Sequence, residues 1–109
     1  MVESKKKNTV LIVDDNENDF IILKRYIADE YEIYYSDGQD NVLDRIENLR
    51  PDCIILDYNL GTVKGIDLLK YIKANSQISY YSVIMLTNER NPEVIVNCIK
   101  HNSTNYLIK

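Results

Sequence analysis

The stretch VLIVDD, from Val10 to Asp15, joins four consecutive apolar residues to two adjacent acids. Short apolar runs rich in Val and Ile are typical of strands that are buried on both faces, as in a parallel sheet. Asp14 and Asp15 follow the run directly, so we expect them at the carboxyl end of that strand. Open parallel sheets bind their ligands at this end of the strands. The stretch therefore predicts a buried strand that brings two carboxylates to a binding edge.

Three later apolar runs end in the same way. CIIL precedes Asp57, VIML precedes Thr87, and YLI precedes Lys109. If all four runs lie parallel, their carboxyl ends meet at one edge of the sheet. We therefore expect three carboxylates, a hydroxyl and an ammonium to share one site.

Segments with helical periodicity separate these runs. Three of them repeat apolar residues at helical spacing: Phe20, Leu23 and Ile27; Val42, Ile46 and Leu49; and Ile66, Leu69 and Ile72. A fourth helix is expected after Asn91, which can cap it, with Pro92 at its first position. The half-polar stretch Tyr31–Tyr35 is typical of an edge strand. Arg50 precedes Pro51, so an extended conformation is expected for Arg50.

The alternation of strands and helices predicts one α/β domain over residues 1–109, with a five-stranded, doubly wound parallel sheet. The predicted elements begin and end with strands, so one helical layer is incomplete. Right-handed crossovers would place a further helix after Lys109, over the face that carries the first helix. We therefore expect a domain truncated after its fifth strand, with self-association through the uncovered apolar face.

Composition narrows the classes of function. The chain has 109 residues, 45% of them hydrophobic, which is enough for one core without disulfides or metals. A net charge of -4 argues against binding to nucleic acid or to an anionic membrane surface. No stretch approaches the roughly 18 apolar residues of a membrane span, so a cytoplasmic location is expected. Cys53 and Cys98 lie on apolar faces and are interpreted as small core residues.

The residues at the strand ends suit phosphoryl chemistry. Asp14, Asp15 and Asp57 offer the oxygen ligands that a hard cation such as Mg2+ prefers. A carboxylate at position 57 is a feasible nucleophile toward a phosphoryl group, giving an acyl phosphate. Lys109 could neutralise the added charge, and Thr87 could donate its hydroxyl to a phosphoryl oxygen. Adjacent Asp residues can also simply begin a helix, where they favour its dipole.

This set of residues resembles the receiver domain of two-component response regulators, of the kind found in chemotaxis regulators, over essentially the whole chain. The resemblance is carried by Asp14-Asp15, by Asp57 with Gly65 eight residues later, by Thr87, and by Tyr106 three residues before Lys109. The fold that it implies is flavodoxin-like, with the strand order 2-1-3-4-5 and normally a fifth helix.

The resemblance implies that Asp57 accepts a phosphoryl group from a phosphohistidine on a sensor histidine kinase or a histidine phosphotransfer protein. Mg2+ would be held by Asp15, Asp57 and the backbone carbonyl of Asn59, with Asp14 reaching it through water. Lys109 would contact the phosphoryl oxygens. The surface would change conformation as Thr87 moves toward the phosphate and Tyr106 rotates inward.

Other positions depart from the family pattern or adjust it. Asn88 stands where a small residue usually follows the switch Thr, and its bulk is expected to alter access and phosphoryl lifetime. Asn59 and Glu89, each two residues past an active position, are expected from the family to tune hydrolysis. Gly61 and Lys64 also differ from the common residues of the family, but neither change removes a catalytic group.

Two other kinds of function remain open. The first is an interaction module of the same fold that works without phosphorylation. The second is a hydrolase that turns over an aspartyl phosphate, which would need a second acid near Asp57; position 59 is Asn, which disfavours it. A flavin site is also disfavoured, because the acidic loop DDNEND would repel a phosphate.

Overall fold

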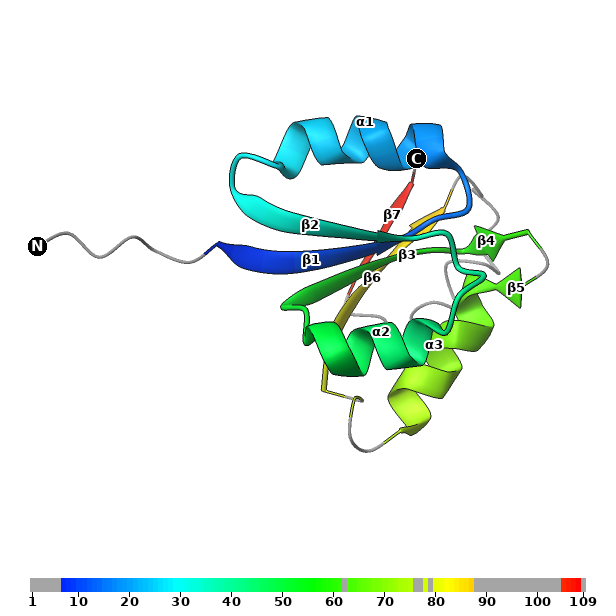
Figure 1. Cartoon of the computed structure of the whole chain (residues 1–109). Coiled ribbons are helices and arrows are strands. Elements are labelled where there is room, and N and C mark those ends of the chain that lie inside the picture. The colour runs from blue at the N-terminus through cyan, green and yellow to red at the C-terminus, as the bar shows by residue number, and fades with distance from the viewer. Residues whose placement is uncertain (1–6, 62, 76–77, 79, 88–104, 109) are drawn as a thin grey trace, which may run out of the picture.

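Five parallel strands form the central sheet of the computed structural model, which describes residues 7–61, 63–75, 78, 80–87 and 105–108 (Figure 1). The strands are β1 (Asn8–Val13), β2 (Tyr31–Ser36), β3 (Cys53–Asp57), β6 (Ser82–Thr87) and β7 (Asn105–Ile108). Their order across the sheet is β2-β1-β3-β6-β7, and every neighbouring pair is parallel. Counted along the chain, this order is 2-1-3-4-5, so the predicted topology is confirmed and the half-polar β2 lies at an edge.

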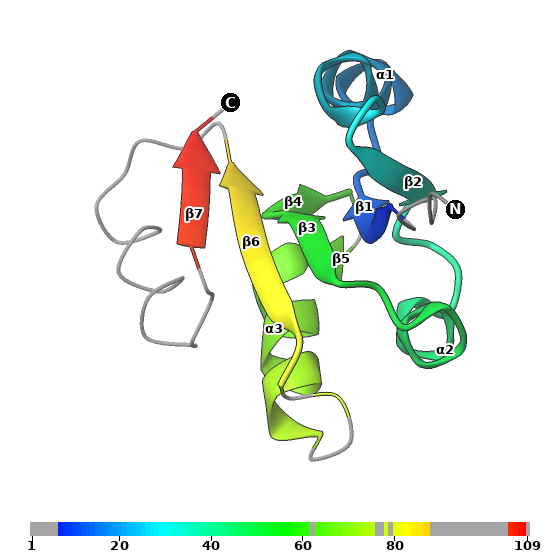
Figure 2. The same cartoon turned by 90° about the vertical axis from the view of Figure 1, so that its left-hand side faces the viewer.

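Three helices cover the sheet in the part of the chain that the structure describes. They are α1 (Glu17–Ile27), α2 (Val42–Leu49) and α3 (Gly65–Ala74). Figure 1 shows α1 on one face of the sheet and α2 and α3 on the other, and the turned view in Figure 2 shows the same division. The three helices predicted from apolar spacing are confirmed. The helix predicted after Asn91, together with Cys98, lies outside the described residues.

The two faces of the sheet carry different numbers of buried apolar side chains among the described residues. Beneath α2 and α3, buried side chains from β1, β3 and β6 join Ile46, Leu69 and Ile72 in one large cluster. On the other face, the buried apolar residues among those that the structure describes are Val10, Ile12 and Ile55, and α1 itself has no buried residue. Phe20, Leu23 and Ile27 pack there as partly buried side chains. The apolar core of the described residues therefore lies mainly on the α2 and α3 side.

The segment after β3 forms a small hairpin. The two-residue strands β4 (Asn59–Leu60) and β5 (Val63–Lys64) pair in antiparallel fashion. Gly61 follows β4 with a φ of 71°, a left-handed conformation that glycine adopts without steric cost. The hairpin leads directly into α3.

The extended conformation expected for Arg50 is wrong. Arg50 has φ 50° and ψ 59°, a left-handed conformation, and its N–H donates to the Ile46 carbonyl 2.9 Å away. It therefore ends α2 in the way that glycine often does, by satisfying a carbonyl of the last turn. Pro51 disfavours the right-handed helical conformation for the residue before it. Arg50 adopts the left-handed conformation in place of an extended one.

None of the three described helices combines the length and the apolar character that crossing a bilayer requires.

Candidate functional site

Three carboxylates meet at the carboxyl end of the sheet. Asp14 and Asp15 follow β1, and Asp57 is the last residue of β3, the neighbouring strand. One carboxylate oxygen from each residue lies within 4.8 Å of the other two. Asp14 and Asp57 are only 1% and 5% exposed, whereas Asp15 is open to solvent. The predicted convergence of these three acids is therefore present.

Backbone N–H groups fix the orientation of the two buried acids. The N–H of Asn16 donates to Asp14 Oδ1 at 2.9 Å, and the N–H of Asn59 donates to Asp57 Oδ1 at 3.2 Å. Asp14 is also held by its own N–H, which donates to the Ser36 carbonyl of β2 at 3.0 Å. The acids are therefore oriented by the main chain that surrounds them.

Gly65 allows the backbone of α3 to approach Asp57 closely. Its N–H donates to the Tyr58 carbonyl at 2.7 Å. A Cβ atom at position 65 would lie 1.8 Å from the Asp57 carbonyl oxygen and 2.8 Å from the carbonyl carbon. Any side chain there would thus displace the backbone of the residue at the centre of the site. This explains in steric terms why glycine stands eight residues after Asp57.

Tyr35 holds the Asp14 backbone in place, a role that the sequence did not predict. Its hydroxyl donates to the Asp14 carbonyl at 2.7 Å, and its ring stacks on Phe20 with centroids 4.2 Å apart. Burial, followed by the charges of Asp14 and Asp37, raises the pKa of Tyr35. The hydroxyl therefore stays protonated and able to donate. No local pattern marks Tyr35, because the contact joins residues 21 positions apart.

Thr87 is also brought to this edge. It is the last residue of β6 and is 1% exposed, and its strand neighbour Leu86 pairs with Asp57. On the other side, Thr87 pairs with Ile108 of β7, and Met85 pairs with Tyr106. The backbone of Tyr106 is thereby placed in the last strand. Lys109, Asn88 and Glu89 lie outside the described residues.

The donor set fits a hard divalent cation. Three carboxylate oxygens at close range are the ligands that Mg2+ prefers, and the exposed Asp15 leaves one side open to water, which Mg2+ retains. Asn59 lies in β4, beside Asp57, and its N–H bond to Asp57 Oδ1 ties it to the same pocket. Among the described residues, this is the group of acids whose geometry suits a metal ion.

Comparison with known proteins agrees with this geometry. The family model of the response regulator receiver domain matches residues 10–109. Chemotaxis protein CheY-3 of Vibrio cholerae serotype O1 is 29% identical over 109 residues, which cover 95% of this chain and 82% of that protein. The two-component response regulator ORR3 of Oryza sativa is 28% identical over 102 residues, covering 92% of this chain and 78% of that protein.

A solved structure of similar size shares both fold and sequence. The chemotaxis response regulator CheY4 of Vibrio cholerae superposes with a TM-score of 0.84 at 28% identity, covering 95% of this chain and 88% of that one. The match of the family model extends over nearly the whole sequence and includes both acidic strand ends. The chain therefore belongs to the response regulator receiver domain family of two-component signalling.

Proposed function

We propose that the chain is a receiver domain whose Asp57 accepts a phosphoryl group from the phosphohistidine of a sensor histidine kinase or a histidine phosphotransfer protein. The observation that carries the proposal is the buried Asp57 carboxylate within 4.8 Å of two further acids, in a chain of this family. The domain is then a phosphoacceptor that assists its own phosphorylation and dephosphorylation, and not an enzyme acting on a separate substrate. Such a partner would place it in the cytoplasm.

The transfer step exchanges one bond to phosphorus for another. A carboxylate oxygen of Asp57 forms a bond to phosphorus while the bond between phosphorus and the donor imidazole nitrogen breaks, and the electron pair stays on that nitrogen. Positioning and charge neutralisation supply most of the catalysis in such transfers. The fixed orientation of Asp57 by the Asn59 N–H contributes to the first of these.

Mg2+ is the proposed cofactor. Asp14, Asp15, Asp57 and the backbone carbonyl of Asn59 would hold it, and it would neutralise negative charge on the phosphoryl oxygens. Without a cation, the carboxylates would repel an incoming phosphoryl group.

The remaining roles are supported by membership of the receiver family. Thr87 would donate its hydroxyl to a phosphoryl oxygen, and Lys109 would provide an ammonium. Thr87 and Tyr106 would form the switch that shifts the population of surface conformations. Asn59, Asn88 and Glu89 would tune the lifetime of the phosphoryl group.

The test is covalent labelling of the whole chain. Incubation with Mg2+ and acetyl phosphate, followed by intact-protein mass spectrometry, should show a gain of one phosphoryl group. Asp57→Asn should abolish the gain, whereas Asp29→Asn, which removes an exposed carboxylate beyond α1, should retain it. An unmodified parent protein with several phosphodonors would favour the alternative, an interaction module of the same fold that works without phosphorylation.

Self-association is a separate part of the proposal. An apolar groove of about 310 Å³ lies between α1 and β6, lined by Asp19, Ile22, Leu23, Tyr26 and Leu86. Tyr26 and Ile22 are 83% and 53% exposed, on the face where uncovered apolar surface was expected. Sedimentation equilibrium should show a dimer at high concentration. A stable monomer would contradict this part of the proposal and leave the phosphoacceptor role untouched.

A further inference from the structure

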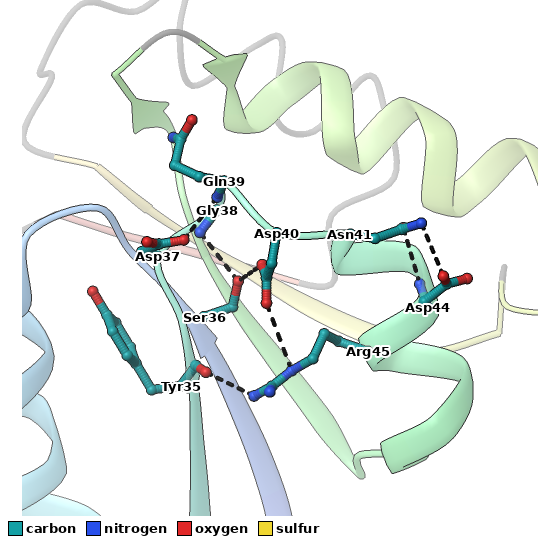
Figure 3. Close-up of polar contacts among 9 residues, drawn as sticks. All are labelled: Tyr35, Ser36, Asp37, Gly38, Gln39, Asp40, Asn41, Asp44 and Arg45. Atoms are coloured by element: carbon teal, nitrogen blue, oxygen red, sulfur yellow. Dashed lines mark hydrogen bonds and ion pairs between the residues drawn. The ribbon is translucent and has the colours of Figure 1, made fainter.

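The loop between β2 and α2 links the strand that is bonded to Asp14 with the β4–β5 hairpin beside Asp57. This loop, residues 37–41, lies after Ser36 at the carboxyl edge of the sheet (Figure 3). At its beginning, the Ser36 carbonyl accepts the Asp14 N–H at 3.0 Å. The preceding Tyr35 hydroxyl donates to the Asp14 carbonyl at 2.7 Å. The acidic end of β1 is thus bonded on two sides to the strand that leads into the loop.

The loop is held in one conformation by its own polar side chains (Figure 3). Ser36 Oγ donates to Asp40 and accepts the Gly38 N–H, and the Gln39 N–H donates to Asp37 Oδ1 at 2.9 Å. Arg45 of α2 closes the loop from below, because its guanidinium donates to the Tyr35 carbonyl at 2.7 Å and lies 3.9 Å from Asp40. A loop with this many internal bonds can hold a neighbouring segment in a fixed place.

The segment that it reaches is the β4–β5 hairpin. Gln39 Nε2 donates to the Leu60 carbonyl at 3.0 Å. The Leu60 side chain is fully buried and packs against Gly38, where an added Cβ would lie 3.2 Å from Leu60 Cδ1. Gly38 has a φ of 86°, so a side chain there would also be strained. The hairpin is therefore attached to the loop by one hydrogen bond and one close apolar contact.

The hairpin in turn borders the acids. Asn59, the residue before Leu60, donates its N–H to Asp57 Oδ1 at 3.2 Å. Gly61, the residue after Leu60, lies so close to Asp15 that an added Cβ would be 3.4 Å from its Oδ2. The Leu60 carbonyl, which accepts the hydrogen bond from Gln39, thus lies between Asn59, which is bonded to Asp57, and Gly61, which lies beside Asp15.

From these contacts we propose that Gln39 is a positioning residue for the cation site: its side-chain amide fixes the β4–β5 hairpin, and with it Asn59 and the Asp57 carboxylate, relative to Asp14 and Asp15. The proposal rests on the proposed function, because the site that Gln39 positions is the Mg2+ site assigned there. Gln39 acts through the Leu60 carbonyl, in the manner of groups that orient metal ligands from outside the coordination shell.

Two substitutions of similar shape test this role. For one of them, positioning and Coulomb attraction predict opposite changes in the affinity for Mg2+. Gln39→Met and Gln39→Glu both remove the Nε2 donor. Gln39→Glu also adds a negative charge near the acids, which by Coulomb attraction alone would strengthen cation binding. Positioning predicts the opposite, a dissociation constant for Mg2+ that rises on the order of tenfold in both variants. Glu47→Met, at an exposed site on α2, is the matched control and should bind Mg2+ like the parent.

Isothermal titration calorimetry with Mg2+ measures the affinity, and hydrogen exchange without metal measures the hairpin itself. In both Gln39 variants, the Asn59 amide should exchange several-fold faster, whereas the Arg50 amide at the far end of α2 should be unchanged. Unchanged Mg2+ affinity in both variants, or tighter binding in Gln39→Glu, would overturn the proposal. So would equal acceleration at Asn59 and Arg50, which would indicate general destabilisation.

The outcomes separate this inference from the function on which it rests. A parent protein that binds Mg2+ and is phosphorylated, with Gln39 variants that bind equally well, contradicts the positioning role alone. A parent protein that binds no Mg2+ contradicts both.

Discussion

At the scale of single residues, the site depends on positions where no other side chain fits. Gly65→Ala would place a methyl group 1.8 Å from the Asp57 carbonyl oxygen, a distance that only backbone movement can relieve. We expect the free energy of unfolding to fall by about 1–3 kcal/mol, as for other overpacked interior positions. Urea denaturation followed by circular dichroism measures the loss.

Gly65→Ala should also lose more phosphoacceptor activity than its lower stability accounts for, because the displaced atoms belong to Asp57. Lys70→Ala, on the exposed side of the same helix, is the control for substitution in α3. Parent-like stability of Gly65→Ala would show that the close approach of α3 to β3 is not required.

A second residue-scale prediction concerns alkaline pH. Burial, followed by a hydrogen bond with Tyr80, raises the pKa of Tyr81 from 10.0 to about 12. The folded state therefore holds this phenolic proton more tightly than the unfolded state. The contribution of protonated Tyr81 to the free energy of unfolding is fully present below pH 10. That stability should be lost progressively as the pH rises from 10 to about 12.

Thermal melts of the parent and Tyr81→Phe across this range provide the measurement. The parent should lose stability more steeply than the variant, since phenylalanine has no proton to lose. Tyr26→Phe, at a side chain on α1 that is 83% exposed, should follow the parent curve. Parallel curves for Tyr81→Phe and the parent would show that deprotonation of Tyr81 does not cause the loss of stability.

At the scale of elements, α2 depends on its N-terminal cap. The Asn41 side chain accepts the Asp44 N–H at 3.2 Å and donates to Asp44 Oδ2 at 2.9 Å (Figure 3). Asn41→Ala should reduce the free energy of unfolding by about 1 kcal/mol, whereas Asn41→Ser should cost less because serine can also cap. Denaturant titration of the three proteins measures both differences. Equal loss in the two variants would mean that the cap contributes little.

Elements with strong periodicity could be predicted from the sequence, and irregular ones could not. The buried runs ending at Asp14 and Asp57 and the spacing of Ile46 or Leu69 each report a face of a strand or helix over several residues. The β4–β5 hairpin has strands of two residues, which is too short for any period to show. Its one local signal was Gly61, a residue suited to a tight turn.

The candidate site could be predicted in part for the same reason. Carboxylates that follow buried parallel strands meet because of topology alone, so Asp14, Asp15 and Asp57 could be placed together from sequence. Tyr35 and Gln39 reach the site through single side-chain bonds across 21 residues of chain. Such contacts depend on loop geometry, which no propensity encodes. The left-handed Arg50 was missed because residue type alone argues against it.

At the scale of the whole molecule, cation binding should couple to stability. Mg2+ that binds only the folded state raises the free energy of unfolding by about 2.7 kcal/mol when its concentration is 100 times the dissociation constant. The melting temperature of the parent should therefore rise with Mg2+ and fall back when a chelator removes the cation. Differential scanning calorimetry records both changes.

Asp57→Asn provides the matching control for this linkage. It removes one ligand and one of three crowded charges, so it should melt higher than the parent without metal and respond less to Mg2+. A melting temperature that rises equally in the parent and Asp57→Asn would indicate that Mg2+ acts elsewhere.

The unequal packing of the two faces has an evolutionary consequence. The described part of α1 carries no buried residue, whereas α2 and α3 together bury six. Mutations at the exposed positions of α1 therefore cost little folding energy, and those beneath α2 and α3 cost much more. Selection for fold will restrict the α2 and α3 side, whereas the exposed positions of α1 can accumulate changes that leave the fold intact. New recognition properties can arise on the α1 surface by drift, while the acidic site and its supporting core stay fixed.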